Sequence, residues 1–170
     1  VSTTKQLKVP YGVEVTYVES AHEMEEVVTA QFPTMDIAVM VAAVSDYYVA
    51  NRSEQKIKKQ QNESGLKLEL VENPDILKWL GHSKKEGQVV IGFAAETTNV
   101  LEYAKAKLEK KKADVIIAND VSNSRIGFNS DNHQVTLLTK DGHIVNLPEK
   151  SKEELALNIW ESLLEEKIIH

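Results

Sequence analysis

Short apolar runs recur along the chain and are separated by segments whose apolar residues repeat at helical spacing. Residues 36–44 read DIAVMVAAV, a run that is too short for a typical helix and apolar on both faces, as a buried parallel strand is. Residues 88–95 and 115–118 repeat this pattern and predict two further buried strands. Apolar and charged residues alternate over 66–71, which predicts a half-buried strand, and 13–18 is expected to be a short strand.

Polar residues with helix-starting chemistry mark the beginnings of the expected helices. Ser20-Ala21-His22-Glu23 has the spacing of a capping box, in which the hydroxyl and the carboxylate satisfy free amide donors, and Ser151-Lys152-Glu153-Glu154 has it again. Asn73-Pro74-Asp75 predicts a third helix start, with an asparagine cap, a proline in the first position and an acid in the first turn. That helix is expected to end near Gly81.

The order of strands and helices predicts the fold class. A helix is expected over 97–112, and a Lys-Asp-Gly turn between 134–139 and 143–147 predicts a β-hairpin. Strands that alternate with helices are typical of an α/β fold. We therefore expect a single domain over residues 1–170, a three-layer, Rossmann-like arrangement with a mainly parallel sheet, followed by a C-terminal β-hairpin and a final helix.

The composition narrows the classes of partner. The 170 residues are 42% hydrophobic and 27% charged, which is ordinary for a folded domain. Twenty basic and 26 acidic residues give a net charge of -6, so a nucleic-acid partner is not expected. No apolar run approaches the roughly 18 residues of a membrane-spanning helix, so we expect no membrane partner and a cytoplasmic location. The absence of cysteine excludes disulfides, thiolate metal sites and a cysteine nucleophile.

Several fingerprints of nucleotide-binding and hydrolytic enzymes are missing. The seven glycines never give the G-x-G-x-x-G spacing of a dinucleotide site. Gly87 and Gly92 have the spacing of a P-loop, but Phe93-Ala94 follows where Lys and Ser or Thr are required. No G-x-S-x-G elbow occurs. These absences weigh against a P-loop enzyme, a serine hydrolase and a nicotinamide or flavin enzyme.

Two patterns near the first buried strand point to a small anion, although each also has a structural interpretation. Ligands of parallel sheets bind beyond the carboxyl ends of the strands. Small residues end the strand there and Asp46 follows, either to bind a ribose hydroxyl or a metal–phosphate group, or to cap the next turn. Lys56-Ile57-Lys58-Lys59 either clamps a polyphosphate or is a solvated loop.

Three later patterns have the same two interpretations. The helix start at 73–76 offers free amides and the positive end of a helix dipole to an anion, or is an ordinary helix start. Gly92 and Phe93 allow close backbone approach and base stacking, or pack in the core. Lys107 and Lys111 project from one helix face, either around an anion or as a solvated helix end. Together the five patterns favour a nucleoside triphosphate site without a P-loop.

Six motifs occur in the order and with the approximate spacing found in phosphopantothenate–cysteine ligases, namely AAVSDY, KIKK, ENPDIL, GFAAET, KLEKKKADVIIANDV and GFNSDNHQV. In many bacteria this ligase is the carboxy-terminal half of a bifunctional protein of coenzyme A synthesis. The chain resembles this family from about Val13 to the last helix, most densely over residues 36–135.

The resemblance implies a reaction. A nucleoside triphosphate, CTP in the typical bacterial enzyme, activates the carboxylate of 4′-phosphopantothenate as an acyl-cytidylate and releases pyrophosphate. The amine of cysteine then attacks, and CMP leaves. Mg²⁺ and lysines are expected to neutralise the departing pyrophosphate, while no flavin is expected on this domain.

The positions that match the family motifs give the expected site residues. By resemblance, Lys56 is the catalytic lysine that reaches the triphosphate and the activated carboxylate. The expected nucleotide-binding residues are Met40, Val41, Ala42, Asp46, Lys56, Pro74, Asp75, Ile76, Leu77, Phe93, Lys107 and Lys111. Residues 46–64 correspond to a mobile flap that closes over the acyl intermediate and excludes water. Metal ligands stay unassigned.

The resemblance also bears on the amino terminus and on the partners. The family domain opens with a strand, a glycine-rich loop and a helix, and nothing here matches them, so we expect an amino-terminally truncated domain whose activity alone is an open question. A homodimer and a fused decarboxylase half upstream are expected by resemblance only. The residue patterns by themselves leave two other classes of protein open. These are a nicotinamide- or flavin-dependent oxidoreductase and a non-catalytic fragment that serves in dimerisation or binding.

Overall fold

The computed structural model describes residues 1–6, 8–58, 65–96, 99–120 and 132–170. The chain divides into two compact units. Residues 1–27 and 43–74 form the first, here called the ribbon unit, and residues 28–42 and 75–170 form the second, here called the sheet unit. None of the described helices is long and apolar enough to cross a lipid bilayer.

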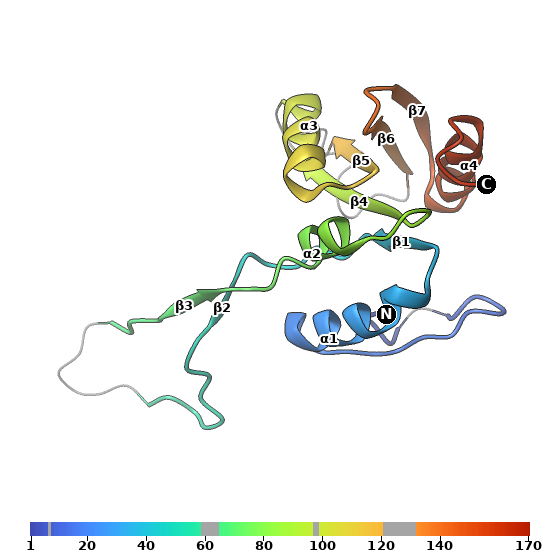
Figure 1. Cartoon of the computed structure of the whole chain (residues 1–170). Helices are drawn as coiled ribbons and strands as arrows, with labels where there is room; N and C mark the ends of the chain where they lie inside the picture. The colour runs from blue at the N-terminus through green and yellow to red at the C-terminus, as the bar shows by residue number, and fades with distance from the viewer. Residues whose placement is uncertain (7, 59–64, 97–98, 121–131) are drawn as a thin grey trace. The chain divides into compact units, whose positions relative to one another are not determined.

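A five-stranded sheet organises the sheet unit (Figure 1). Its strand order is β1-β4-β5-β6-β7. The three strands β1, β4 and β5 are mutually parallel, while β6 and β7 add two antiparallel pairings. The bounds are β1 (Ile37–Met40), β4 (Val89–Glu96), β5 (Val115–Asp120), β6 (Asn132–Thr139) and β7 (Ile144–Ser151).

Helices cover both faces of this sheet, which confirms the predicted three-layer α/β fold. The helices of the sheet unit are α2 (Ile76–Ser83), α3 (Val100–Lys111) and α4 (Lys152–Glu165). α3 packs on β5 and α2 on β4, whereas α4 packs on β6 and β7 (Figure 1). The predicted hairpin is present as β6–β7, and it extends the main sheet, so half of the four strand pairings are antiparallel.

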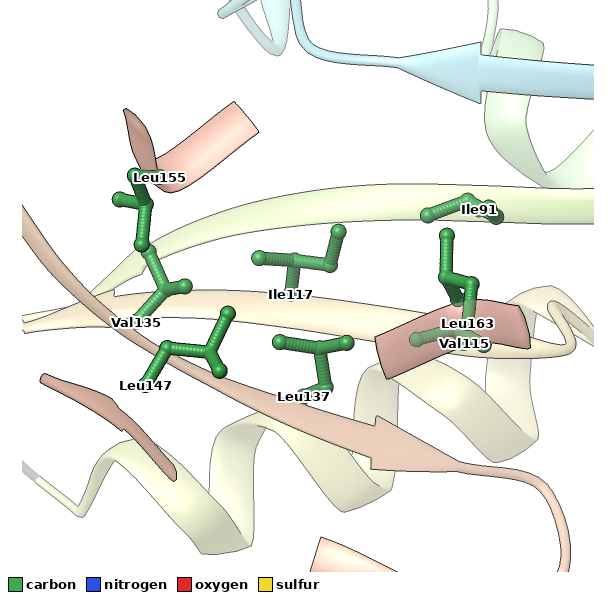
Figure 2. Close-up of a cluster of buried hydrophobic side chains, with 8 residues drawn as sticks. All are labelled: Ile91, Val115, Ile117, Val135, Leu137, Leu147, Leu155 and Leu163. Atoms are coloured by element: carbon green, nitrogen blue, oxygen red, sulfur yellow. The ribbon is translucent and has the colours of Figure 1, made fainter. Parts of the chain in front are cut away.

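The core beneath α4 shows why these strands read as continuous apolar runs. Alternate residues of β4, β5 and β6 point to α4, because successive side chains of a strand face opposite sides of the sheet. Figure 2 shows the resulting cluster, formed by Ile91, Val115, Ile117, Val135, Leu137, Leu147, Leu155 and Leu163. The intervening residues Val90 and Ile116 are equally buried on the other face. A strand buried on both faces must be apolar at every position.

The capping box predicted at Ser151 is present, whereas the one predicted at Ser20 is only half formed, because Glu23 binds the Glu19 amide in place of the Ser20 amide. Before α1 (Ala21–Gln31), the Ser20 hydroxyl accepts from the Glu23 amide at 3.2 Å and the Glu23 carboxylate accepts from the Glu19 amide at 2.8 Å. Before α4, the Ser151 hydroxyl accepts from the Glu154 amide at 3.3 Å, and the Glu154 carboxylate accepts from the Ser151 amide at 3.3 Å.

The predicted cap of α2 was wrong, whereas its end lies within two residues of the expected one. Asp75, not Asn73, caps the helix, and its Oδ1 accepts from the Lys78 amide at 3.0 Å. The Asn73 side chain instead donates to the Ser45 carbonyl oxygen at 2.9 Å. The helix continues to Ser83, and a Cβ at Gly81 would collide with the Lys111 carbonyl oxygen. Glycine is required at this point since α2 packs so closely on the last turn of α3.

The ribbon unit contains less regular structure than expected. Its two strands are β2 (Tyr47–Val49) and β3 (Leu70–Glu72), which pair antiparallel. The strand expected over 66–71 therefore begins only at Leu70. Residues 13–18 form no strand, and only Tyr17 makes an isolated parallel bridge, with Ser2. The expected flap loop at 46–64 begins as β2, and its residues 59–64 lie outside the described part of the chain.

Candidate functional site at the carboxyl edge of the sheet

The candidate site lies where the parallel strands of the sheet unit end. Met40 is in register with Gly92, and Gly92 is in register with Ile116. Because β1, β4 and β5 run in the same direction, their carboxyl ends share one edge of the sheet, here called the carboxyl edge. Met40, Val41 and Ala42 leave β1 at this edge, and Val41 and Ala42 are exposed. The structure therefore places these three predicted residues beside β4, in the position where α/β sheets bind ligands.

Lys107 reaches the same strand from α3. Its ammonium donates to the backbone carbonyl oxygen of Phe93 at 2.9 Å. The side chain of Lys107 is half-buried along α3, so its charged end is directed to β4. The Phe93 ring packs partly against the core cluster beneath α4, which means that much of its surface is used in core packing.

Asp75 joins the beginning of α2 to the end of α3. One carboxylate oxygen caps α2 at the Lys78 amide, and the other forms an ion pair with the Lys111 ammonium. Partial burial alone would raise the pKa of Asp75, but the hydrogen bonds from Lys111 and from the Lys78 amide outweigh it and hold that pKa below its usual value. Asp75 is therefore ionised at neutral pH.

The two predicted phosphate-binding lysines each have an acceptor within the protein. Lys107 and Lys111 are four residues apart on α3 and share one face of it. Lys107 donates to the Phe93 carbonyl group and Lys111 to the Asp75 carboxylate. These contacts hold both ammonium groups in place and reduce their mutual repulsion.

The remaining predicted residues of α2 contribute to packing. Ile76 and Leu77 are buried, so only their backbone groups could face a ligand. A Cβ at Gly92 would meet the Leu77 side chain and Ile116. The space left by Gly92 is therefore filled by Leu77, and not kept open for a ligand as the sequence had suggested.

Three predicted residues belong to the ribbon unit. Asp46 and Lys56 are exposed, and Pro74 is half-buried. The Asp46 carbonyl oxygen accepts from the Asn73 amide at 2.8 Å, which ties the two ends of the ribbon together. Lys56 lies on the segment that connects β2 to β3. The predicted residues of the sheet unit thus lie around β1, β4, α2 and α3. Asp46, Lys56 and Pro74 are part of the ribbon unit.

One polar pair at the carboxyl edge was missed by the sequence analysis. Asn119, near the end of β5, contacts the buried His133 of β6, with 3.1 Å between Asn119 Nδ2 and His133 Nδ1. The Asn119 Oδ1 atom is buried and has no hydrogen-bond partner in the part of the chain that is described. The only signal in the sequence was a polar residue directly after the apolar run at 115–118.

A second missed cluster lies at the opposite edge of the sheet. Asp114, directly before β5, is buried and accepts from Lys84 at 2.7 Å, from Lys140 at 2.9 Å and from the Val90 amide at 2.8 Å. Burial alone would raise the pKa of Asp114, but these three partners outweigh it and hold the pKa below its usual value. This position, away from the strand ends that bind ligands, indicates a structural role.

Comparison with known proteins identifies the family. A model of the DNA/pantothenate metabolism flavoprotein C-terminal domain matches residues 1–166. The chain belongs to this family.

Two relatives of the chain are bifunctional proteins. The chain is 42% identical over 146 residues to the coenzyme A biosynthesis bifunctional protein CoaBC of Bacillus subtilis, covering 86% of this chain and 35% of the relative. It is 43% identical over 159 residues to the CoaBC protein of Haemophilus influenzae, covering 94% of this chain and 39% of the relative. The chain thus spans less than half the length of either relative.

A solved structure of the same family has the same fold. The C-terminal domain of a coenzyme A biosynthesis bifunctional protein CoaBC superposes with a TM-score of 0.74 at 37% identity, over 93% of this chain and 68% of that one. These findings confirm the resemblance that the six motifs indicated, to the carboxy-terminal domain of the bifunctional coenzyme A biosynthesis proteins.

Proposed function

We propose that this domain is a phosphopantothenate–cysteine ligase of coenzyme A biosynthesis, acting in the cytoplasm. It would join 4′-phosphopantothenate to L-cysteine through an acyl-nucleotidylate, with conversion of CTP to CMP and pyrophosphate. The observation that carries the proposal is the 42% identity over 86% of the chain to a bifunctional protein of coenzyme A biosynthesis. Relatives named as coenzyme A biosynthesis proteins do not favour the alternative of a nicotinamide- or flavin-dependent oxidoreductase.

The grouping of lysines along the chain supports a role in polyphosphate chemistry. Eight of the 20 basic residues lie within 56–59 and 105–112, although the chain as a whole is acidic. Lys107 is directed to β4 by the Phe93 carbonyl group, and Lys111 lies one helical turn further along α3. A cation held in place, as Lys107 is, stabilises the negative charge that develops on a departing pyrophosphate with little reorganisation.

Lys56 is the residue to which we assign the chemistry at the activated carboxylate. An ammonium group that contacts both the α-phosphate and the carboxylate would stabilise charge as the anhydride forms and would hold the two groups in position. Its place on the connection between β2 and β3 fits a segment that closes over a reactive intermediate and shields it from water. No flavin is expected on this domain.

Mg²⁺ would enter with the nucleotide. Within the described ranges, no group of three or more His, Asp or Glu side chains gathers as a metal site. Mg²⁺ commonly keeps several waters and is held by phosphate oxygens with one or two carboxylates. Asp46 and Asp75 are the predicted site residues that carry a carboxylate, and Mg²⁺ would add charge neutralisation at the phosphates.

The ribbon unit supports the expected homodimer. Tyr47, Leu68 and Leu70 are more than half exposed on or beside β2 and β3. A two-stranded ribbon has little stability by itself and presents free edges for pairing. A second copy of the ribbon would cover these apolar side chains. Light scattering should therefore give the mass of a dimer, and Leu68→Glu together with Leu70→Glu should give a monomer.

The test of the proposed reaction is pyrophosphate release from CTP that depends on 4′-phosphopantothenate. The assay would use these 170 residues alone and joined to the preceding segment of the Bacillus subtilis relative. Formation of the cysteine amide should follow when cysteine is added. If neither form releases pyrophosphate with any nucleoside triphosphate, the proposed function is wrong.

Lys56→Ala should lower turnover at least about 100-fold, as expected for the loss of one electrostatic contact to the transition state. Lys58→Ala is the matched control, because it removes the same charge from the same exposed run and should retain most of the activity. Circular dichroism would show whether both variants stay folded. Equal activities of the two variants would contradict the role given to Lys56.

A further inference from the structure

Asp75 is an anion supplied by the protein itself, at a place where the sequence predicts an external one. Its two carboxylate oxygens bind the two groups that the sequence assigned to phosphate, the free amides at the start of α2 and the Lys111 ammonium. We propose that Asp75 competes with the polyphosphate ligand for Lys111, so that Lys111 exchanges Asp75 for a phosphate oxygen when the ligand binds. This inference rests on the proposed nucleotide site.

The exposure of Asp75 allows such an exchange. The side chain of Asp75 is 39% exposed, whereas that of Asp114, another carboxylate paired with lysine in the sheet unit, is only 4% exposed. Asp75, when it loses Lys111, can be solvated and still cap α2 through its second oxygen. A buried carboxylate has neither option, because losing its partner leaves an unpaired charge away from water.

The negative charge of Asp75 predicts whether its removal strengthens or weakens polyphosphate binding. Asp75 neutralises Lys111, so a polyphosphate approaching the pair meets no net charge and must first break an existing contact. In Asp75→Asn, the amide oxygen keeps the capping bond to α2, since asparagine is as good a cap as aspartate. The variant removes the competing negative charge and frees Lys111. A residue that only positioned Lys111 would have the opposite effect, because its loss would weaken ligand binding.

Titration calorimetry with inorganic tripolyphosphate in buffer without Mg²⁺ tests the exchange, because Mg²⁺ would compete with Lys111 for the Asp75 carboxylate. Because the lost contact is a partly exposed ion pair, Asp75→Asn should bind about fivefold more tightly than the wild type at low salt. This advantage should shrink as salt screens the charges. Glu109→Gln, also on α3, is the matched control, since it removes one negative charge near Lys111 without a described ion pair, and it should change binding less than twofold.

A double-mutant cycle separates exchange from a general charge effect. In a Lys111→Gln background, Asp75→Asn should give little or no gain in affinity, because no lysine is freed. The inference is overturned if Asp75→Asn binds more weakly than or as tightly as the wild type, if the gain persists fully with Lys111→Gln, or if the wild type does not bind tripolyphosphate. The ligase assay is independent, since loss of turnover with an intact binding cycle would refute the proposed function alone.

Discussion

Helix α2 is held at its two ends by the same pair of chemical groups in two different environments. At its start, Asp75 pairs with Lys111, and directly after its end Lys84 pairs with Asp114. The first carboxylate has one lysine partner and is partly solvated. The second is buried and has two lysines and a backbone amide. The comparison teaches that burial, more than the identity of the groups, decides whether an ion pair is a fixed part of the fold or is free to exchange its partner.

The physical reason lies in what happens when a partner leaves. A buried charge without a partner has lost its hydration and cannot recover it, so its pair must stay intact for the protein to stay folded. An exposed charge regains water, and its pair contributes only about 0–1 kcal/mol. The pair at the start of α2 is therefore suited to ligand binding, and the pair after its end to joining α2, β4, β5 and the β6–β7 turn.

The largest loss of stability should come from disturbing the close packing of α2 on the last turn of α3. Gly81→Ala places a methyl group against the Lys111 backbone, which cannot move independently of α3. We expect a loss of at least about 3 kcal/mol in the free energy of unfolding, measured by urea denaturation. Gly65→Ala is the control, because a Cβ at Gly65 meets nothing within 4 Å and its φ is not in the left-handed region. A fully stable Gly81→Ala would show that α2 and α3 separate without cost.

Asp114→Asn should have the next largest effect. The substitution keeps the shape of the side chain but removes the charge that pairs with Lys84 and Lys140. Because both lysines are partly exposed and can be hydrated, we expect a loss of about 2 kcal/mol, or about 6 °C in Tm. Calorimetric scans of the wild type and variant would measure it. Substitution of an ordinary surface residue changes the free energy of unfolding by only about tenths of a kcal/mol. A change in Tm below about 0.5 °C would therefore contradict the structural role of Asp114.

A fall in pH should lower the free energy of unfolding, because it protonates the Asp75 and Asp114 carboxylates. The pKa values of Asp75 and Asp114 are lower in the folded protein than in the unfolded chain. The stability that they contribute is therefore fully present above the unfolded value of about 4 and is lost as the pH falls through the folded values. Urea midpoints measured from pH 6 to pH 3 should fall less steeply for Asp114→Asn than for the wild type. Parallel slopes would mean that Asp114 is not paired in solution.

Asp75→Asn should have the smallest effect on stability. The variant keeps the cap of α2 and loses only a partly exposed ion pair, so we expect a change below about 1 kcal/mol. Asp75→Ala should lose about 1 kcal/mol more, because it also removes the cap. Urea denaturation of both variants would measure the difference. A loss in Asp75→Asn as large as that in Asp114→Asn would remove the distinction between the two pairs.

Local patterns predicted most of the sheet unit. The strands β4 and β5, the hairpin and the capping box at Ser151 were recognisable because each depends on a few neighbouring residues and on strong burial. The buried strand predicted over 36–44 was wrong in part, since only Ile37–Met40 form β1, an edge strand whose side chains are half-buried or exposed. The ribbon unit was harder, since its apolar residues at 13–18 and 66–71 are largely exposed and periodicity is informative only where one face is buried. The start of α2 was misplaced because Asn73 and Asp75 are both good caps, and a contact between Asn73 and Ser45 determines which one is used.

The sequence alone determined the α/β class, the family resemblance and the residue types available for binding a polyphosphate. These depend on order, spacing and composition, which are properties of the chain itself. Tertiary structure decided which of these residues meet. Lys111 and Asp75 are 36 positions apart, and the buried Asp114 cluster draws on residues from 84 to 140. Such pairings, and the burial that distinguishes a fixed carboxylate from an exchangeable one, exist only after strands and helices have packed, because burial is a property of the surroundings and not of the residue.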